Sequence, residues 1–232
     1  MGKDKITAVV LAAGQGKRMN SKIAKQYLML KDKPVLYYSL RTFEDSIVDD
    51  IILVVGSGEI EYVRKHVIEA YQFKKVNHII EGGKERYNSV YNALVSISNT
   101  NYVLIHDGAR PFVTNEIVDR IIKNVIDTKA CIAGMPVKDT IKISDKDGFV
   151  SDTPSRENVW MIQTPQAFEY ELIKKAYDII MKEENIHVTD DAMVLEYTLG
   201  NPIKLIEGSY QNIKITTPED IKIGEMLLSD QG

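Results

Sequence analysis

Short apolar runs alternate with helix-like patterns along most of this chain, and this alternation limits the folds open to it. Apolar, mostly β-branched runs predict strands over residues 6–11, 50–55, 76–80 and 102–105. Helical spacing of apolar residues predicts helices over residues 35–43, 59–71, 86–96 and 116–126. Apolar strands separated by helices are typical of a doubly wound, mostly parallel sheet. We therefore expect an α/β fold with helices on both faces of the sheet.

The second half of the chain continues this pattern after one interruption. Residues 159–162 and the sequence QTPQAF are expected to be extended, and helices are predicted over 171–182 and from Thr189 onward. Late strands are predicted at 202–206 and 212–215. A last helix is expected to begin with Thr217 as its N-cap and Pro218 at its first position. No repeat or low-complexity linker divides residues 1–232, so we expect one domain.

The interruption is a half-polar segment that predicts a projecting β-hairpin. Residues 138–143 alternate polar and apolar side chains, Asp145 to Gly148 is a turn sequence, and Phe149 and Val150 resume extended structure. Short half-polar strands are not stable alone, so the hairpin should pack on something else. We expect a β-arm at about 138–157 that serves dimerisation, with a second subunit as its partner.

The loop after the first strand is suited to a polyphosphate. Four small residues allow a ligand to approach the backbone, namely Ala12, Ala13, Gly14 and Gly16. The cations Lys17, Arg18, Lys22 and Lys25 follow them, and no Asp or Glu occurs between Gly14 and Lys31. Backbone N–H groups and unneutralised cations together hold phosphate oxygens. The alternative is a tight turn with a solvated basic rim, which leaves the absence of acids unexplained.

Two better-known phosphate motifs do not fit this loop. It lacks the G-x4-G-K-[ST] pattern of a P-loop. It also lacks the third glycine of a dinucleotide fingerprint, because Met19 stands there, and the second strand ends at Val55 without an acid for a ribose. An NAD-dependent dehydrogenase is therefore disfavoured.

Asp107 follows the fourth strand and precedes Gly108, Ala109 and Arg110. A carboxylate at a strand end suits Mg²⁺, which takes one or two protein ligands beside substrate phosphate oxygens. Arg110 would then clamp a phosphate. His106 is expected to orient this loop rather than to catalyse. The alternative for Asp107 is a turn-forming or capping residue.

The sequence contains no Ser/His/Asp or Cys/His arrangement that supports a side-chain nucleophile. A phosphate monoester needs no general base, because it is largely ionised near neutral pH. Its obstacle is repulsion from the polyphosphate that it attacks, which cations relieve. The basic residues therefore favour nucleotidyl transfer over hydrolysis.

Composition excludes several other classes of protein. The formal net charge of −4 argues against a general nucleic-acid binder, so an anionic ligand would be attracted by a local patch. Cys131 is the single cysteine and is expected to be a small buried hydrophobe, which fits a reducing, cytoplasmic location. No apolar run reaches the length of a membrane span, and the N-terminus has no signal-peptide character.

Several segments together resemble one family of enzymes. They are LAAGQGKRM, KQYL, GGKERYNSV, HDGARPFV, PVKDTIK, QTPQAF, TDDA and NIKITTPED. In order and spacing, from about Ile6 to Leu228, they resemble the 2-C-methyl-D-erythritol 4-phosphate cytidylyltransferases of the non-mevalonate isoprenoid pathway. The resemblance implies a Rossmann-like nucleotidyltransferase fold and a homodimer with exchanged arms. It implies in-line attack of the methylerythritol phosphate on the α-phosphorus of CTP, with Mg²⁺ present, giving the CDP-alcohol and pyrophosphate.

The resemblance also implies roles for individual residues. Arg18 and Lys25 would stabilise charge on the triphosphate, and Asp107 would bind the metal. Lys214 and Arg156 would position the methylerythritol phosphate. The residues around CTP would be Ala12, Ala13, Gly14, Gly16, Gly82, Gly83 and Ser89. Those around the acceptor would be Arg110, Thr140 and Thr189, with Thr140 and Arg156 reaching the neighbouring subunit from the arm.

Two departures and two rival functions accompany the resemblance. The family usually has proline where this chain has Ala24, which should loosen the loop that carries Lys25. Lys84 stands where some members have an acid near the base. A cytidylyltransferase for another polyol phosphate, such as ribitol 5-phosphate, is the nearest rival, although Gly108 and Ala109 favour methylerythritol. A non-catalytic nucleotide-binding protein is the rival from a different class.

Overall fold

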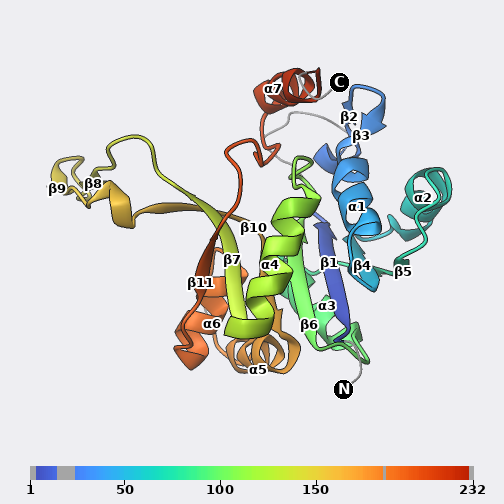
Figure 1. The fold of residues 1–232 in the computed structure, drawn as a ribbon, viewed down its shortest axis with the longest axis horizontal. Helices are drawn as coiled ribbons and strands as arrows, with labels where there is room; N and C mark the ends of the chain where they lie inside the picture. The colour runs from blue at the N-terminus through green and yellow to red at the C-terminus, as the bar shows by residue number, and fades with distance from the viewer. Residues whose placement is uncertain (1–3, 15–23, 185–186, 230–232) are drawn as a thin grey trace.

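A single seven-stranded sheet organises the computed structural model, which describes residues 4–14, 24–184 and 187–229 (Figure 1). Its strands are β1 (Ile6–Ala12), β4 (Asp50–Val55), β5 (Val76–Glu81), β6 (Tyr102–Asp107), β7 (Ala130–Pro136), β10 (Trp160–Glu169) and β11 (Lys204–Glu207). They lie in the order β11-β7-β10-β6-β1-β4-β5. All neighbours pair in parallel except β10, which runs antiparallel to both β6 and β7. The predicted doubly wound, mostly parallel α/β fold is confirmed.

Helices cover both faces of the sheet, as the apolar strands require. One face packs on α1 (Val35–Asp45), α2 (Ile60–Val63) and α4 (Asn115–Thr128). The other face packs on α3 (Arg86–Ser96), α5 (Tyr170–Ile180) and α6 (Asp191–Leu199). In β1, Ala8 and Val10 belong to the first core and Val9 to the second, and the alternate residues of β4 divide in the same way. The central strands β1 and β4 therefore need apolar side chains on both sides.

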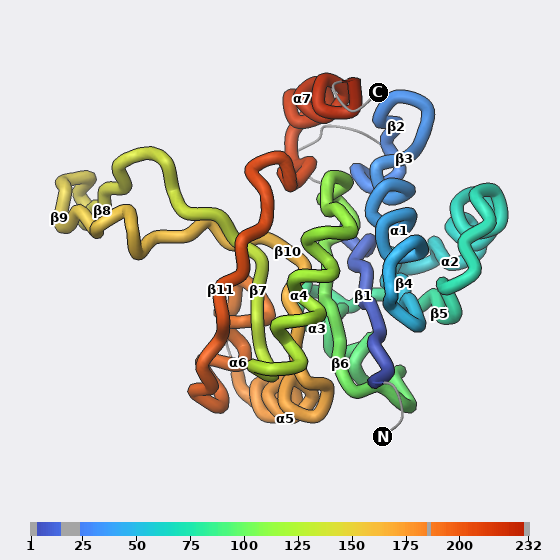
Figure 2. The backbone as a smooth tube through the Cα atoms, viewed as in Figure 1, coloured from blue at the N-terminus to red at the C-terminus, as the bar shows by residue number. Residues whose placement is uncertain are grey.

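Smaller elements complete the chain. A 3-10 helix at Lys25–Tyr27 and the short pair β2 (Met29–Leu30) and β3 (Lys33–Pro34) lead into α1. The last helix, α7 (Pro218–Ser229), lies near β2 (Figure 2). Cys131 is fully buried in the core, as expected. No helix in the described ranges is long and apolar enough to cross a membrane.

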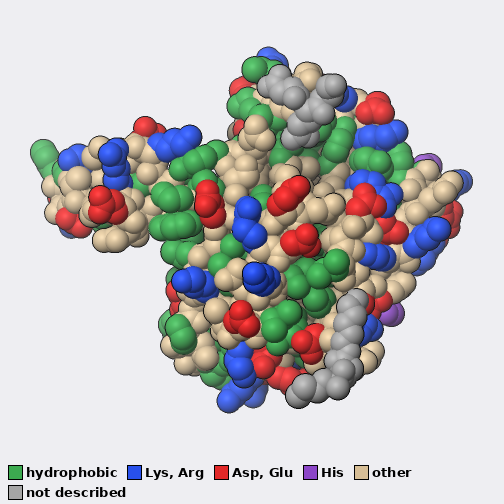
Figure 3. Space-filling model, in the orientation of Figure 1, with side chains coloured by type: hydrophobic (Ala, Val, Ile, Leu, Met, Phe, Trp, Pro, Cys, Tyr) green, Lys and Arg blue, Asp and Glu red, His purple; other side chains and the backbone are tan. Residues whose placement is uncertain are grey.

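The arm between β7 and β10 stands away from the body of the protein (Figure 3). It contains β8 (Ile143–Ser144), β9 (Val150–Asp152) and a 3-10 helix at Arg156–Asn158. The predicted turn is present, because the N–H of Gly148 donates to the carbonyl of Asp145 at 3.2 Å and Gly148 has a φ of +87°. The side chains of Phe149 and Val150 remain exposed. A projecting hairpin is thus found where the sequence predicts one.

Three sequence-based expectations differ from the structure. Only Ile143 of the predicted strand 138–143 lies in a strand, because the residues before it have no pairing partner in the protomer. Residues 212–215 form no strand; the N–H of Ile215 donates a hydrogen bond, of 2.8 Å, to the carbonyl of Ala109. The helix predicted over 59–71 changes after Val63 into a π-helix at Arg64–Glu69.

Candidate active site

A cavity of about 580 Å³ opens at the carboxyl ends of β1, β5 and β6, where the sequence predicts the ligand site. We call it the large cavity. Of the predicted CTP-binding residues, it is lined by Ala12, Ala13, Gly14, Gly83 and Ser89. Lys25, Gln26, Lys84, Glu85, Arg86, Asp107 and Lys214 also line it. Two predicted residues, Gly16 and Arg18, lie outside the described residues.

The loops after β1 and β5 approach each other closely. A Cβ atom on Gly82 would lie 2.5 Å from Cβ of Ala13 and 2.7 Å from Oγ of Ser89, so no other residue fits there without displacement. Oγ of Ser89 accepts a hydrogen bond from the N–H of Gly83 at 3.0 Å. Gly82 therefore allows the loops after β1 and β5 to pack closely beside the large cavity, although it does not itself line the cavity.

The turn that carries Lys25 is held in place by the two residues that follow it. The amide of Gln26 is buried and donates to the carbonyl of Ala12 at 2.5 Å. The hydroxyl of Tyr27 donates to the carboxylate of Glu59 at 2.7 Å. Ala24, just before the turn, has a φ of −60°. These contacts hold Lys25 at the large cavity from two sides.

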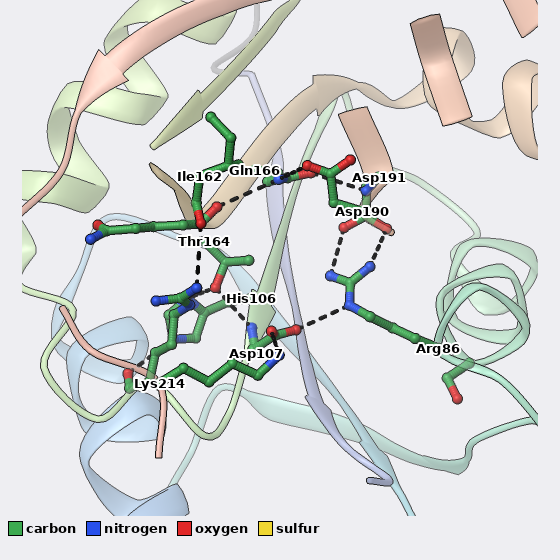
Figure 4. A network of polar contacts seen from close by, with 12 residues as sticks. Arg86, His106, Asp107, Ile162, Thr164, Gln166, Asp190, Asp191 and Lys214 are labelled. Atoms are coloured by element: carbon green, nitrogen blue, oxygen red, sulfur yellow. Dashed lines mark hydrogen bonds and ion pairs between the residues drawn. The ribbon is translucent and has the colours of Figure 1, made fainter. Parts of the chain in front are cut away.

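Asp107, the last residue of β6, has a cation on each oxygen (Figure 4). Its Oδ2 accepts from Nζ of Lys214 at 2.6 Å, and its Oδ1 accepts from Nε of Arg86 at 3.2 Å. Burial alone would raise the pKa of the Asp107 carboxyl, but Arg86, Lys214 and Arg110 hold it well below its usual range. Asp107 is therefore a carboxylate at any physiological pH.

A second cavity of about 210 Å³ adjoins the first, and we call it the small cavity. It shares Arg86, Asp107 and Lys214 with the large cavity. Its remaining lining comes from Arg110, Ile162, Gln163, Thr164, Gln166, Thr189 and Asp190. Arg110 and Thr189, both predicted around the acceptor, thus lie in one cavity, while five of the predicted nucleotide residues line the other.

His106 is buried, and both of its ring nitrogens are engaged. Nδ1 lies 3.0 Å from Oγ1 of Thr164, and Nε2 lies 3.2 Å from the carbonyl of Arg110. Burial lowers the pKa of His106 to about 4. The side chain therefore links the Asp107–Arg110 loop to β10 and lines neither cavity, which agrees with the expectation that it orients this loop.

The arm residues lie apart from these cavities. Thr140 and Arg156 are exposed, and neither lines the large or the small cavity of this protomer. The guanidinium of Arg156 contacts only the carbonyl of Lys138, at 3.4 Å, among the hydrogen bonds and ion pairs of the described residues. The protomer thus brings Lys25, Asp107, Lys214, Arg110 and Thr189 together but leaves the two arm residues outside.

Arg86 and its partner Asp191 are site residues that were not predicted from the sequence. Arg86 donates to both oxygens of Asp191, at 2.9 and 2.8 Å, and Asp191 is fully buried. One signal was available in the pair Asp190-Asp191. The first carboxylate caps α6 by accepting from the N–H of Met193, so the second, on an otherwise apolar helix start, needs a buried cation.

The described residues contain no group of three or more His, Cys, Asp or Glu side chains that could hold a metal ion. A metal that binds through a protein cage is therefore not supported within those ranges. Asp107 instead presents one carboxylate where the two cavities meet. That donor set suits Mg²⁺, which often takes a single carboxylate and completes its shell with phosphate oxygens and water.

A Rossmann-like sheet with a glycine-lined, cation-bearing cavity at its carboxyl edge suits a nucleotidyltransferase. Comparison with known proteins narrows the class. The profile of the 2-C-methyl-D-erythritol 4-phosphate cytidylyltransferase family matches residues 6–230, and the chain belongs to this family.

Individual relatives agree with the profile. The 2-C-methyl-D-erythritol 4-phosphate cytidylyltransferase of Lachnoclostridium phytofermentans is 53% identical over 227 residues, which cover 98% of this chain and 97% of that protein. The enzyme of the same name from Alkaliphilus oremlandii is 48% identical over 226 residues, which cover 97% of this chain and 95% of that protein. The crystal structure of 4-diphosphocytidyl-2C-methyl-D-erythritol synthase from Anaerococcus prevotii superposes with a TM-score of 0.87 at 34% identity, covering 97% of this chain and 96% of that one.

Proposed function

We propose that this protein transfers the cytidylyl group of CTP to 2-C-methyl-D-erythritol 4-phosphate, giving the CDP-alcohol and pyrophosphate. The observation that carries the proposal is the pair of adjoining cavities that share Asp107 and Lys214. The large cavity has the glycine loops and Lys25 that a triphosphate requires. The small cavity has Arg110 for the phosphate of an acceptor. A transfer between two bound substrates needs such a shared boundary, where the new bond forms.

The roles of the described residues follow from these positions, and those of Gly16 and Arg18 follow from the sequence alone. Ala12, Ala13, Gly14, Gly83 and Ser89 hold the nucleotide together with Gly16, and Gly82 shapes the wall of the large cavity. Lys25 and Arg18 stabilise the triphosphate charge, and Lys214 positions the acceptor phosphate beside Arg110 and Thr189. The acceptor phosphate attacks the α-phosphorus, and pyrophosphate leaves with the electron pair. No general base is needed, because the nucleophile is already ionised near neutral pH.

A divalent cation, most simply Mg²⁺, would be held by Asp107 together with oxygens of the substrate. When bound, it neutralises phosphate charge and the charge that develops at phosphorus. In the structure Lys214 occupies Oδ2 of Asp107. Lys214 thus balances the carboxylate in the protein as it stands, and the same ammonium group can turn to the acceptor phosphate.

The decisive experiment measures pyrophosphate release from CTP with methylerythritol phosphate or ribitol 5-phosphate, with and without Mg²⁺. We expect turnover of methylerythritol phosphate that depends on the metal. Turnover of ribitol 5-phosphate alone would assign the rival substrate. Binding of CTP without pyrophosphate release from either acceptor would identify a non-catalytic nucleotide-binding protein, and a Lys25→Ala variant with full activity would overturn the role of Lys25.

We further propose that the β-arm at about 138–157 exchanges between two subunits and that Thr140 and Arg156 complete the partner's small cavity. The support is that both residues are exposed and distant from their own cavities, while Phe149 and Val150 leave apolar surface on the arm. Mixing Lys214→Ala and Arg156→Ala protomers tests this exchange. In an equimolar, randomly assembled mixture, about half of the dimers are mixed and each has one intact site, so roughly a quarter of all sites should be active. A site built within one protomer would recover no activity.

A further inference from the structure

Arg86 is the one residue at the boundary of the two cavities that neither the sequence nor the proposed roles account for. The cavities share three residues, and the other two, Asp107 and Lys214, already have roles in metal and acceptor binding. The side chain of Arg86 is 29% exposed, so it faces the cavities without lying free in solvent. Its place borders the point where the acceptor phosphate meets the nucleotide.

The guanidinium of Arg86 is fixed by a carboxylate that cannot move. Asp191 is fully buried, and both of its oxygens accept from Arg86, at 2.9 and 2.8 Å. The hydroxyl of Tyr177 donates a further hydrogen bond to Asp191 at 2.6 Å. A planar guanidinium held by two parallel hydrogen bonds has a defined orientation, which an ammonium group could not adopt.

Asp191 is in turn fixed to the sheet by Gln166 of β10. The side-chain oxygen of Gln166 accepts from the N–H groups of Asp191 and Ala192, at 3.1 and 3.0 Å. The amide of the same side chain donates to Asp190 at 2.9 Å. The start of α6 is therefore anchored to β10 by the contacts drawn in Figure 4, and both Gln166 and Asp190 line the small cavity.

The third guanidinium nitrogen of Arg86, Nε, connects this fixed arrangement to Asp107. This nitrogen donates to Oδ1 of Asp107 at 3.2 Å, which leaves the opposite oxygen, Oδ2, directed to Lys214. We infer that Arg86 is a positioning residue for cytidylyl transfer: pinned by Asp191, it sets the orientation in which Asp107 meets the cation and the nucleotide. This inference rests on the proposed function and adds a residue to it.

The test compares three graded variants with a matched control. Arg86→Lys keeps the charge but loses the bridge, Asp191→Asn weakens the anchor, and Tyr177→Phe removes only one hydrogen bond to it. The control is Arg41→Lys, because Arg41 also donates two hydrogen bonds to one aspartate, but that aspartate, Asp45, is half-exposed on α1 and lies away from both cavities. For each protein we would measure kcat, KM for CTP, the affinity for Mn²⁺ in the presence of CTP, and the melting temperature.

For Arg86→Lys and Asp191→Asn we expect kcat and Mn²⁺ affinity to fall about 10- to 100-fold, as substitutions behind metal ligands commonly do. Tyr177→Phe should lower Mn²⁺ affinity a few-fold, and Arg41→Lys should change neither quantity. In an Asp107→Asn background, Arg86→Lys should have little further effect on kcat, because Arg86 acts through Asp107.

Three results would overturn the inference. The first is a lower melting temperature of Arg86→Lys or Asp191→Asn with unchanged kcat and Mn²⁺ affinity. The second is a loss of kcat in Arg86→Lys that adds fully to the loss in Asp107→Asn. The third is an unaltered Tyr177→Phe protein when Arg86→Lys and Asp191→Asn both fail to fold. The Mn²⁺ measurement does not require turnover. A wild-type protein that releases no pyrophosphate would therefore refute the proposed function, while Mn²⁺ binding would still decide the role of Arg86.

Discussion

Asp107 and Arg156 are both predicted site residues, yet their surroundings in the protomer differ in almost every respect. Asp107 is 8% exposed, ends a central strand and is held by two cations. Arg156 is exposed on the arm and has one long contact, with the carbonyl of Lys138. The first residue is oriented by its own chain before any ligand arrives.

The difference indicates two ways of preorganising a site. A buried charge must be paired, so the strand-end network fixes its members as the protein folds. An exposed arginine on a narrow arm loses side-chain entropy only when a partner surface orders it. We therefore expect substitutions in the network to affect both stability and activity, and those on the arm to affect activity and assembly alone.

The largest effect is expected for Lys214→Met, which removes one cation from the boundary of the cavities. Loss of an electrostatic contact of this kind lowers kcat by about 100- to 1,000-fold. Steady-state pyrophosphate release measures it. Lys174→Met is the matched control, since Lys174 also pairs with an aspartate, at 2.6 Å, but on α5. Equal losses in both variants would contradict a special role for Lys214.

Next comes the pH dependence of stability at His106. Its pKa is about 4 in the folded protein and 6.5 ordinarily, so the unfolded chain binds this proton first as the pH falls. Unfolding therefore takes up a proton between these values, and the free energy of unfolding should decrease by about 3 kcal/mol as the pH drops through that window. Stability contributed by ionised Asp107, whose pKa is lowered, is lost only at more acidic pH.

Urea unfolding from about pH 7 to about pH 4.5 measures this decrease. His106→Gln should flatten the curve by most of that amount. His78→Gln, at an exposed position of β5, is the matched control. If His106→Gln shifts the curve down uniformly and leaves its slope intact, the burial of a neutral imidazole is not what makes the network pH-sensitive.

A smaller effect is expected on the arm. Arg156→Ala should lower kcat/KM for methylerythritol phosphate by about 10- to 100-fold, while stability changes by less than about 0.5 kcal/mol. Kinetics and thermal unfolding on the same preparation separate the two. Lys146→Ala, in the exposed turn of the same arm, should alter neither. A destabilised Arg156→Ala protein would erase the contrast with Asp107.

The smallest effect concerns Ala24, which stands where the resemblance described under Sequence analysis leads us to expect a proline. Ala24 already has a φ of −60°, within the range that a proline ring fixes. Ala24→Pro should therefore stabilise the protein by about 0.4–1 kcal/mol by restricting the unfolded chain. Ala24→Gly should shift stability in the opposite direction, so the pair of melting temperatures brackets the wild type. Destabilisation by proline would show that the turn before Lys25 depends on the Ala24 N–H.

Much of the fold could be predicted from the sequence because its strongest signals are local. Strand β4 has the predicted bounds, and α3 matches residue for residue, since burial on both faces or one face leaves a clear period. The prediction of a strand at 212–215 was wrong. Apolar alternation also occurs where side chains are buried without a neighbouring strand, as Ile215 shows.

The site residues could likewise be predicted only where the signal is local. Residues that directly follow strands could be placed, since parallel strands end at one edge. The Arg86–Asp191 pair could not be predicted, because its members are 105 positions apart and helical periodicity does not identify the partner of a charged side chain. The roles of Gly16 and Arg18, which lie outside the described ranges, stay predictions from the sequence.

Strand β10 has a consequence for anyone who redesigns this protein. One end of it receives the arm at Trp160, and the other half supplies Gln163, Thr164 and Gln166 to the small cavity. Its pairing with β7 shifts between Ile162 and Gln166, so the two halves meet at an irregular joint. An arm grafted from a relative must preserve the spacing across that joint. A one-residue insertion there would rotate the cavity floor to the opposite face of the sheet.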